Sequence, residues 1–343
     1  MSIVALTKVF VGLDYHASGV QVCVMDSQGK VLVNHAYRND WREIVAAVQR
    51  RCGASAIVQA AIESCCGAAN LAEELISKAG WSVDVAHPGY VNRMKQNPDK
   101  TDFSDAQLLA DLERVGYLPR VWLAPEEVRE LRRLVRYRQD LAQDRRNVKL
   151  RIRAMLREGR ITDPNCRPWT QAWLRWLREM APLSVQSRWV ADRQLRRLEL
   201  LQESIQEVEL RLRDLAVTDT QIQKLLAQPG IGLITAVTIR AEIGRFDRFR
   251  TGKQLSRFCG LSPRNASSGE KQADAGLIKA GNRELRTILI EAAHRLARYN
   301  ERWSELNIAL RSRGKKGSVV AAAIANRWIR WLFYQMQPQE LAA

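Results

Sequence analysis

The sequence has 343 residues, of which 46% are hydrophobic, and it carries a formal net charge of +17. This length and apolar content exclude a disordered tail and are sufficient for two domains with hydrophobic cores. A positive charge of this size favours polyanionic partners, and nucleic acid is the first to consider.

Membrane, exported and zinc-binding proteins are disfavoured. The most apolar stretch, SVVAAAIANRWIRWLFYQM, is interrupted by Arg327 and Arg330, so we expect no membrane partner. The N-terminus lacks a basic region followed by an apolar run and a cleavage site, which predicts a cytoplasmic protein. The six cysteines and four histidines contain no CxxC pair or ligand cluster, so neither a zinc site nor a disulfide framework is expected.

The first 125 residues predict an α/β domain. Residues 8–37 contain three strand-like runs with the turn Asp-Ser-Gln-Gly before the third, which indicates an antiparallel meander. Helical and strand-like segments then alternate at 40–52, 55–63, 67–80, 81–88, the helix that contains Asp105, and 120–125. A meander followed by such alternation predicts a mixed sheet with helices on its faces, and we assign it to residues 1–125.

Residues 126–217 predict a basic helical, coiled-coil region. Leucine and arginine dominate, and apolar residues recur every three or four positions in two long segments. Two long helices, as an antiparallel pair, are the natural interpretation. Between them a turn and a short helix carry Trp169, Trp173 and Trp176 on one stripe, which is more typical of a core or dimer interface than of a base-stacking platform.

Residues 218–343 predict an α-rich domain. The segment 222–244 indicates a helix, a Pro-Gly-Ile-Gly turn and a second helix, and 251–263 indicates a short helix ending in a turn. A polar, glycine-punctuated loop is expected at 267–282. Two helices, at 283–300 and 317–336, complete the prediction.

Four acids in the first domain are candidates for a metal site. Asp14 lies inside the apolar run VFVGLDYHA, and Glu63 ends the run IVQAAIE. A carboxylate on or beside a strand is costly to bury unless a metal or a basic group compensates it. Asp102 and Asp105 are three residues apart at a predicted helix start, so they share one helical face.

Asp102 and Asp105 alone have a second interpretation, as acids that cap helix N–H groups and face the positive end of the helix dipole. Together with Asp14 and Glu63, they could converge at one edge of a mixed sheet. Divalent cations take oxygen ligands, and a two-metal site stabilises both the attacking and the leaving oxygen of a phosphoryl transfer. We therefore favour a divalent-metal site for phosphoryl transfer.

Several basic or glycine residues are candidates for nucleic-acid contacts. In the turn QPGIGLITA, Gly230 and Gly232 would let backbone N–H groups approach a phosphate, as in a helix-hairpin-helix, although an ordinary corner between helices has the same pattern. The arginines of the middle helices have few acids among them, so helix pairing and nucleic-acid contact are both open. The candidates there are Arg132, Arg136, Arg146 and Arg153.

The polar loop contains Ser267 and Ser268 before a glycine, which by default indicates a solvated turn. A nucleophilic serine would need cations nearby to activate the hydroxyl and hold a phosphate. The neighbouring cations in sequence are Arg264, Lys271, Lys279 and Arg283.

Six blocks together resemble, in order, the IS110 family of insertion-sequence transposases. They are VGLDYHASGVQVCVMD, AIESCCGAANLAEEL, KTDFSDAQLLADL, LLAQPGIGLITAVTI, FCGLSPRNASSG and GLIKAGNRELRTILIEAA. The resemblance extends from about residue 9 to about residue 335, although the middle helices are similar only in character. The ordered set is specific, whereas any single block is weak.

The resemblance implies an RNase H-like, RuvC-like first domain whose Asp14, Glu63, Asp102 and Asp105 are catalytic and bind Mg²⁺ or Mn²⁺. It implies that Ser268 is the catalytic nucleophile that forms a covalent phosphoserine link to DNA, with Ser267 as the adjacent alternative. It also implies donor and target DNA, a guide (bridge) RNA, and homodimers that assemble into a tetrameric synapse. Delegation of sequence reading to a guide suits a basic surface with little base-specific chemistry.

Two other functions remain open on the residues. A Holliday-junction-type nuclease would use the same carboxylates with water as the nucleophile. A non-catalytic, basic nucleic-acid-binding protein would keep its acids for structure.

Overall fold

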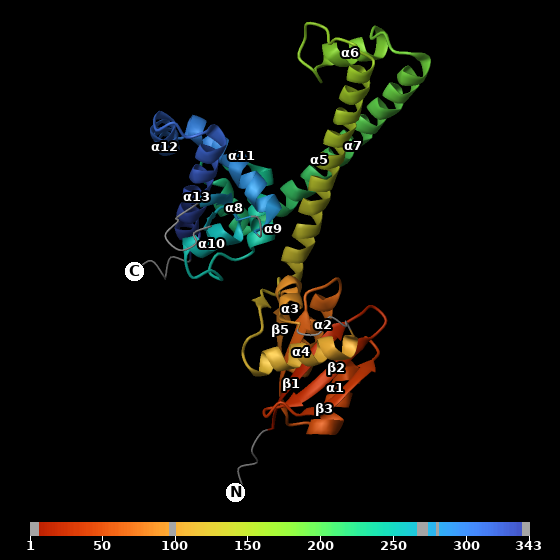
Figure 1. Ribbon diagram of the computed structural model, residues 1–343, viewed down its shortest axis with the longest axis vertical. Helices are drawn as coiled ribbons and strands as arrows, with labels where there is room; N and C mark the ends of the chain where they lie inside the picture. Colours follow the sequence, from red (N-terminus) through yellow and green to blue (C-terminus); the bar gives the residue numbers. More distant parts are fainter. Residues whose placement is uncertain (1–6, 96–100, 266–273, 279–280, 338–343) are drawn as a thin grey trace. The chain divides into compact units, whose positions relative to one another are not determined.

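The computed structural model describes residues 7–95, 101–265, 274–278 and 281–337. The chain divides into two compact units, and the division falls between Ala124 and Pro125 (Figure 1). We call them the N-terminal unit and the C-terminal unit and describe each by itself. The C-terminal unit contains both the long helices and the α-rich region. Its division at residue 217 stays a prediction.

The N-terminal unit is built on a six-stranded mixed sheet with the order β3-β2-β1-β4-β5-β6. Neighbouring strands are antiparallel from β3 to β1 and between β5 and β6, whereas β1, β4 and β5 are parallel. The strands are β1 (Lys8–Tyr15), β2 (Val20–Asp26), β3 (Val31–Tyr37), β4 (Ile57–Glu63), β5 (Ser82–Ala86) and β6 (Arg120–Val121). This topology confirms the predicted mixed sheet.

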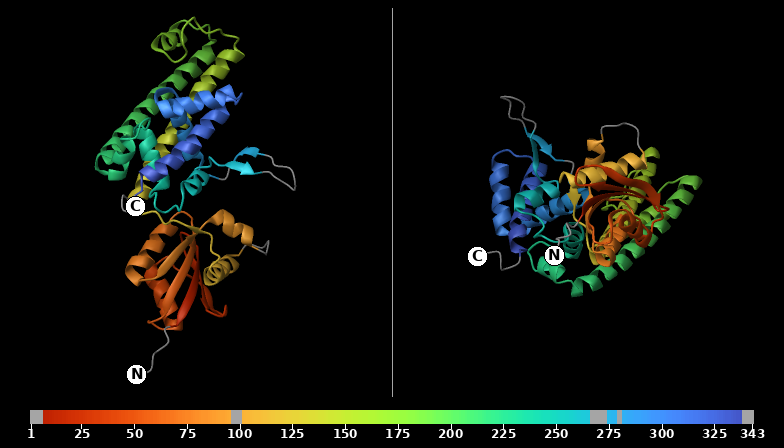
Figure 2. Two further views of the ribbon diagram at one scale, coloured as in Figure 1. Left: turned by 90° about the vertical axis from the view of Figure 1, so that its left-hand side faces the viewer. Right: turned by 90° about the horizontal axis from the view of Figure 1, so that it is seen from below.

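Helices cover both faces of this sheet (Figure 2). The alternation along β1 sends Val9, Val11 and Leu13 into a core with α1 (Trp41–Cys52) and α2 (Ala68–Ala79). The opposite face packs against α4 (Asp102–Arg114), and the apolar contacts there include Cys23 and Met25 of β2 with Ala106 and Ala110 of α4. Gly12 and Asp14 therefore lie on the α4 side.

The close packing of α4 on β1 requires a glycine at position 12. A Cβ atom on Gly12 would lie 1.9 Å from the carbonyl oxygen of Ala106 and 2.6 Å from the amide nitrogen of Ala110. No side chain can occupy that space because both neighbours are backbone atoms of a helix. Gly12 thus sets how near α4 comes to β1.

A short helix that the sequence analysis did not predict, α3 (Pro88–Met94), precedes α4. Pro88 occupies its first turn, where the missing N–H is harmless, and Nδ1 of His87 accepts a hydrogen bond from the amide of Gly89 over 3.1 Å. The expected strand ended at Pro88, and the proline instead begins a helix. Lys95 follows the last residue of α3.

Two long helices, α5 (Glu126–Glu158) and α7 (Val185–Thr218), dominate the C-terminal unit and run antiparallel with α6 (Gln171–Glu179) at the turn (Figure 1). The predicted pair of long helices is confirmed. Trp173 of α6 is fully buried in the core of this unit, which supports a core role for the tryptophan stripe. The description of the pair as a coiled coil stays a prediction.

The rest of the C-terminal unit is α-rich, as predicted. Its helices are α8 (Thr220–Leu226), α9 (Leu233–Ile243), α10 (Gly252–Phe258), α11 (Arg283–Tyr299), α12 (Glu301–Ser312) and α13 (Gly317–Gln335). The sequence analysis missed α12, which begins immediately after Asn300 ends α11. The apolar helix α13 buries Trp328 and Ile329 in the protein core. Among the described helices, none is both long and apolar enough to cross a membrane.

The segment expected to be a loop contains part of a β-ribbon. Strands β7 (Pro263–Asn265) and β8 (Asp274–Leu277) pair antiparallel, and the ribbon extends away from the helices of the C-terminal unit in Figure 2. The prediction of a loop across 267–282 is therefore wrong at β8. Its glycine-punctuated sequence lacks the alternation by which strands are recognised.

Candidate active site

Two of the predicted acids lie at the carboxyl ends of adjacent parallel strands. Asp14 and Glu63 each follow the last pair in the register of β1 and β4, Leu13 with Ile62. Asp14 lies on the same side of β1 as Gly12, and Glu63 lies on the same side of β4 as Ala61, which packs with residues of α4. Both positions therefore belong to the face that α4 covers.

The other two acids come from the first turn of α4. Asp102 is exposed, whereas Asp105 is buried. The hydroxyl of Thr101 is the helix cap and accepts a hydrogen bond from the amide of Ser104 over 3.2 Å. Neither carboxylate is therefore the N-cap, although both keep a favourable position at the positive end of the helix dipole.

His16 connects Asp14 to Asp102. Its Nε2 atom lies 3.4 Å from Oδ2 of Asp14 and 3.4 Å from Oδ1 of Asp102. Among the described residues, these three form the group whose ligand atoms are close enough for one metal ion, all within 4.8 Å of one another. Glu63, which is partly buried, and Asp105, which is buried, both lie outside this group, so their role as ligands stays a prediction.

The sequence analysis did not include His16 among the site residues. A usable signal was present, because alternate residues of an extended chain lie on the same side and His16 is two residues after Asp14. A histidine–cysteine pattern does not identify His16, because its partners are the carboxylates of Asp14 and Asp102.

The electrostatics of Asp14 favour a bound cation. Burial raises the pKa of this carboxyl, the nearby imidazole of His16 opposes the shift, and the charges of Asp102 and Asp105 raise the pKa further. The charges of Asp102 and Asp105 therefore act on the carboxyl of Asp14, whose side chain is only 15% exposed. A divalent cation with oxygen ligands would relieve this repulsion, so the residues fit a metal site.

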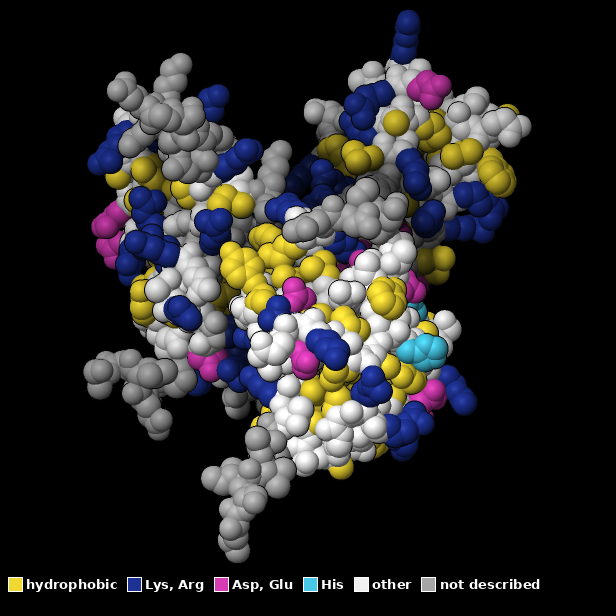
Figure 3. Space-filling model, turned by 60° about the horizontal axis from the view of Figure 1, so that its bottom comes forward, with side chains coloured by type: hydrophobic (Ala, Val, Ile, Leu, Met, Phe, Trp, Pro, Cys, Tyr) yellow, Lys and Arg dark blue, Asp and Glu magenta, His cyan; other side chains and the backbone are white. Residues whose placement is uncertain are grey.

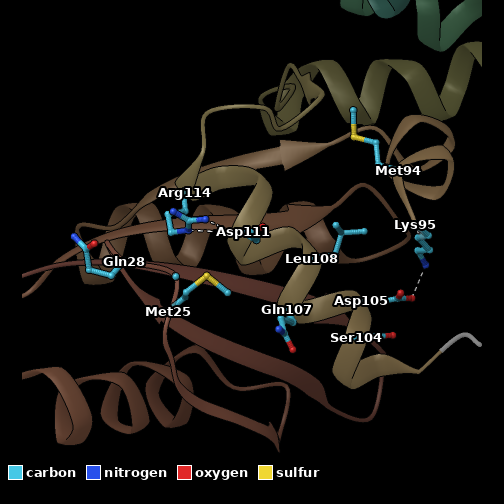
Figure 4. Close-up of a pocket in the computed structure, with 11 residues that line it drawn as sticks. Met25, Gln28, Met94, Lys95, Ser104, Asp105, Gln107, Leu108, Asp111 and Arg114 are labelled. Carbon is cyan, nitrogen blue, oxygen red and sulfur yellow. Dashed lines mark hydrogen bonds and ion pairs between the residues drawn. The ribbon is translucent and has the colours of Figure 1, made fainter. Parts of the chain in front are cut away.

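Asp105 has a cationic partner that the sequence analysis missed. The ammonium of Lys95 lies 2.6 Å from Oδ2 of Asp105, and the two side chains are 16% and 9% exposed (Figure 4). Lys95 precedes Asp105 by ten residues and directly follows Met94, the last residue of α3. The sequence did not reveal this pair, because the position of Lys95 depends on α3, and α3 was not predicted.

Three of the predicted nucleic-acid-binding arginines line one groove of the C-terminal unit. The groove has a volume of about 760 Å³, and Arg136, Arg146 and Arg283 contribute to its walls together with Glu242 and Asn282. Lys and Arg side chains are also scattered across the face of the molecule drawn in Figure 3, in line with the net charge of +17. Asp140 and Glu284 also line the groove, so three acids accompany its three arginines, and contact with a phosphate backbone stays a prediction.

Part of this basic charge is compensated within the chain. Arg136 makes two hydrogen bonds to the buried carboxylate of Glu242, and Nε of Arg132 donates to the carbonyl of Ala241 over 3.0 Å. Arg153 forms an ion pair with Asp163.

Arg132, Arg136 and Arg153 thus stabilise the fold. Any contact of theirs with nucleic acid would be an additional role and stays a prediction. Arg146, Arg264 and Arg283 are exposed.

The predicted phosphate-binding turn connects α8 to α9. Gly230 has a φ of +80°, which favours glycine, and Gly232 precedes the first residue of α9. A Cβ atom on Gly230 would also lie 2.6 Å from a methyl carbon of Leu296. The glycines therefore serve a tight corner, and the helix-hairpin-helix role of the turn stays a prediction.

The remaining predicted residues, Ser267, Ser268, Lys271 and Lys279, lie outside the described residues. The structure describes the residues that flank them. Arg264 belongs to β7, and the side chain of Asn282 caps α11 by accepting a hydrogen bond from the amide of Leu285 over 3.0 Å.

Comparison with known proteins shows similarity to transposases along most of the chain. A family model described as a transposase, the DEDD domain of the IS110 type, matches residues 11–160. A second model, described as "Transposase IS116/IS110/IS902 family", matches residues 222–307.

Three relatives extend this similarity. "Putative transposase y4qE" of Sinorhizobium fredii is 33% identical over 277 residues, which cover 73% of this chain and 68% of that protein. The transposase for insertion sequence element IS1111A of Coxiella burnetii is 28% identical over 341 residues, covering 95% and 89%. The transposase for insertion sequence element IS1328 of Yersinia enterocolitica is 29% identical over 276 residues, covering 79% and 81%.

The carboxylates on one face of a mixed sheet, the helical second unit and these similarities define a DNA transposase. The chain belongs to the IS110 family of insertion-sequence transposases. The DEDD family and the group of Asp14, His16 and Asp102 point to the use of a divalent metal.

Proposed function

We propose that this transposase cleaves and exchanges strands between donor and target DNA, using carboxylates of the N-terminal unit and a serine of the C-terminal unit. The observation that carries the proposal is the approach of Asp14 and Asp102 to one imidazole on the α4 face of the sheet. We further propose that the N-terminal unit is an RNase H-like, RuvC-like domain. The strand order and the antiparallel first three strands support this assignment.

Asp14, Glu63, Asp102 and Asp105 are the proposed ligands of Mg²⁺ or Mn²⁺. When bound, the cation would stabilise the charge that develops at the scissile phosphate. The protein contributes the placement of the ligands: Gly12 lets α4 approach β1, and His16 lies between the carboxylates of Asp14 and Asp102.

Ser268 is the proposed nucleophile, and Ser267 is the adjacent alternative. Its oxygen would form a bond to phosphorus while the bond from phosphorus to the leaving-strand oxygen breaks. The serine hydroxyl gives up its proton, and the leaving oxygen gains one. Because one phosphate ester replaces another, the covalent phosphoserine intermediate would keep the bond energy for strand exchange.

The proposed partners are donor DNA, target DNA and a guide (bridge) RNA. Arg136, Arg146 and Arg283 are the proposed backbone contacts in the groove, and the exposure of Arg146 and Arg283 supports this role, whereas Glu242 already pairs with Arg136. Arg132, Arg153, Arg264, Lys271 and Lys279, with the turn at Gly230 and Gly232, complete the proposed nucleic-acid contacts.

We propose that the chain forms homodimers that assemble into a tetrameric synapse in the cytoplasm, at the nucleoid. The long helices α5 and α7 would serve dimerisation, RNA binding or both.

The experiment that tests the chemistry incubates purified protein with the element-flanking RNA, Mg²⁺, donor DNA and target DNA. A covalent protein–DNA adduct is expected with wild type and with Ser262→Ala, a matched control that changes a serine before the loop. The adduct should disappear in the Ser267→Ala/Ser268→Ala double variant and in Asp14→Asn, and omission of the RNA should abolish it.

An adduct that survives in the double serine variant would overturn the serine mechanism. DNA cleavage without any adduct would favour water as the nucleophile. An unchanged adduct without RNA would refute RNA guidance while leaving the serine chemistry in place.

A further inference from the structure

The ion pair between Lys95 and Asp105 lies at one of the carboxylates assigned above to metal binding. Its short distance of 2.6 Å and the low exposure of both side chains mark it as a defined contact rather than a solvated surface pair. In Figure 4 the lysine side chain extends from the end of α3 toward the carboxylate. One oxygen of Asp105 is thereby already occupied by a cation.

A lysine and a divalent metal ion compete for the same carboxylate. The charge of Asp105 contributes to the raised pKa of Asp14, so Asp105 is close enough to sense charge at the rest of the site. An ammonium on Asp105 would therefore repel a divalent cation that approaches Asp14 and Asp102. Removal of that ammonium would make metal binding more favourable.

The surroundings leave the ammonium a place to move. A cavity of about 640 Å³ opens beside Asp105, and Lys95 and Ser104 are among the residues that line it (Figure 4). A lysine carries its charge on a flexible four-carbon stem, so it can change partners without any change in the backbone that bears it.

We propose that Lys95 is an exchangeable counter-cation of the metal site. It neutralises Asp105 while no divalent cation is bound, and it leaves Asp105 when metal binds. This inference rests on the proposed function, because it takes Asp105 as a metal ligand. Lys95 acts through the occupancy of Asp105 and is in this sense a positioning residue.

The first test measures Mn²⁺ affinity of the full chain by electron paramagnetic resonance or calorimetry. Lys95→Gln should bind Mn²⁺ about tenfold more tightly than wild type, because a repelling charge has been removed. Lys95→Arg keeps the charge and should bind Mn²⁺ as wild type does. Lys78→Gln is the matched control, since it removes the same charge from the exposed pair with Glu74 in the same unit. Its affinity should stay within about twofold of wild type.

A second measurement uses the wild-type chain, so it does not depend on the folding of a variant. An amine-reactive reagent and mass spectrometry should find Lys95 protected without metal and several-fold more reactive with saturating Mn²⁺. Lys78 provides the internal reference and should not change.

Equal or weaker Mn²⁺ binding by Lys95→Gln, or equal labelling of Lys95 with and without Mn²⁺, would overturn the proposal. Failure of the metal site itself has a different result. In that case Mn²⁺ would bind wild type no better than Asp14→Asn.

Discussion

Arg136 of α5 and Glu242 of α9 form a two-point ion pair, with Nε–Oε1 and Nη2–Oε2 distances of 2.9 and 3.1 Å. The side-chain amide of Asn282, at the start of α11, donates to the same carboxylate over 2.8 Å. Glu242 is almost fully buried. One carboxylate therefore joins α5, α9 and the start of α11 in the C-terminal unit.

The first prediction concerns Glu242. Glu242→Ala should lower the free energy of unfolding by about 3 kcal/mol, because it leaves Arg132 and Arg136 without their buried counter-ion. Urea unfolding followed by circular dichroism measures the change. Glu130→Ala removes an exposed acid of α5 that pairs with Arg133 and should change stability by less than about 0.5 kcal/mol. Equal effects of the two substitutions would show that the junction at Glu242 does not stabilise the fold.

The second prediction concerns Gly12. Gly12→Ala should destabilise the N-terminal unit by about 3 kcal/mol or more, because the added methyl would meet the backbone of α4 at 1.9 Å. The displacement of α4 should also weaken Mn²⁺ binding. Calorimetric unfolding and metal titration measure the two effects.

Gly232→Ala is the matched control for Gly12→Ala. A methyl group added at this position would meet open space, and the φ of −94° suits alanine without strain. Its unfolding temperature should match that of wild type. A stable Gly12→Ala variant with normal metal affinity would contradict the proposed packing of α4.

The third prediction concerns the charge of Asp14. Without divalent metal, Asp14→Asn should raise the free energy of unfolding by about 1 kcal/mol, because burial and the neighbouring carboxylates disfavour its ionised form. Added Mn²⁺ should stabilise wild type but not this variant. Thermal unfolding with and without Mn²⁺ tests both parts, and Glu74→Gln serves as an exposed control. Loss of stability in metal-free Asp14→Asn would refute the electrostatic argument.

The fourth prediction concerns pH and Asp163. The hydrogen bond from Arg153 and that from Nε1 of Trp173, at 3.0 Å, lower the pKa of this carboxyl below its ordinary value. A depressed folded-state pKa stabilises the protein above the unfolded-state value, and the contribution is lost as the pH falls through the folded-state pKa. Asp163→Asn should therefore cost about 1 kcal/mol at about pH 6 and progressively less below about pH 4.

Urea titrations at a series of pH values measure this difference. The control is Asp144→Asn, which removes an exposed acid 3.9 Å from Arg197 and should have little effect at any pH. A cost for Asp163→Asn that grows as the pH falls would contradict the sign of the effect.

The local pattern of the sequence determined much of the fold. Valine-rich runs of β-type residues predicted the strands that became β1 to β4. The three/four spacing predicted α5 and α7, because this period reflects which side of a helix is buried. Short elements were harder to predict. The helix α3 depends on Pro88 at its start, and β8 is paired through a ribbon rather than through a hydrophobic face.

The site divides in the same way. Asp14, Glu63, Asp102 and Asp105 became candidates because each interrupts, ends or begins a recognisable element, and their role in catalysis stays a prediction. Only the tertiary structure decided how the charges are paired.

Lys95 meets Asp105, His16 connects Asp14 to Asp102, and Arg136 meets a carboxylate 106 residues away. Local sequence determines which face of an element is buried. The packing of elements distant in sequence decides which charges come together on those faces.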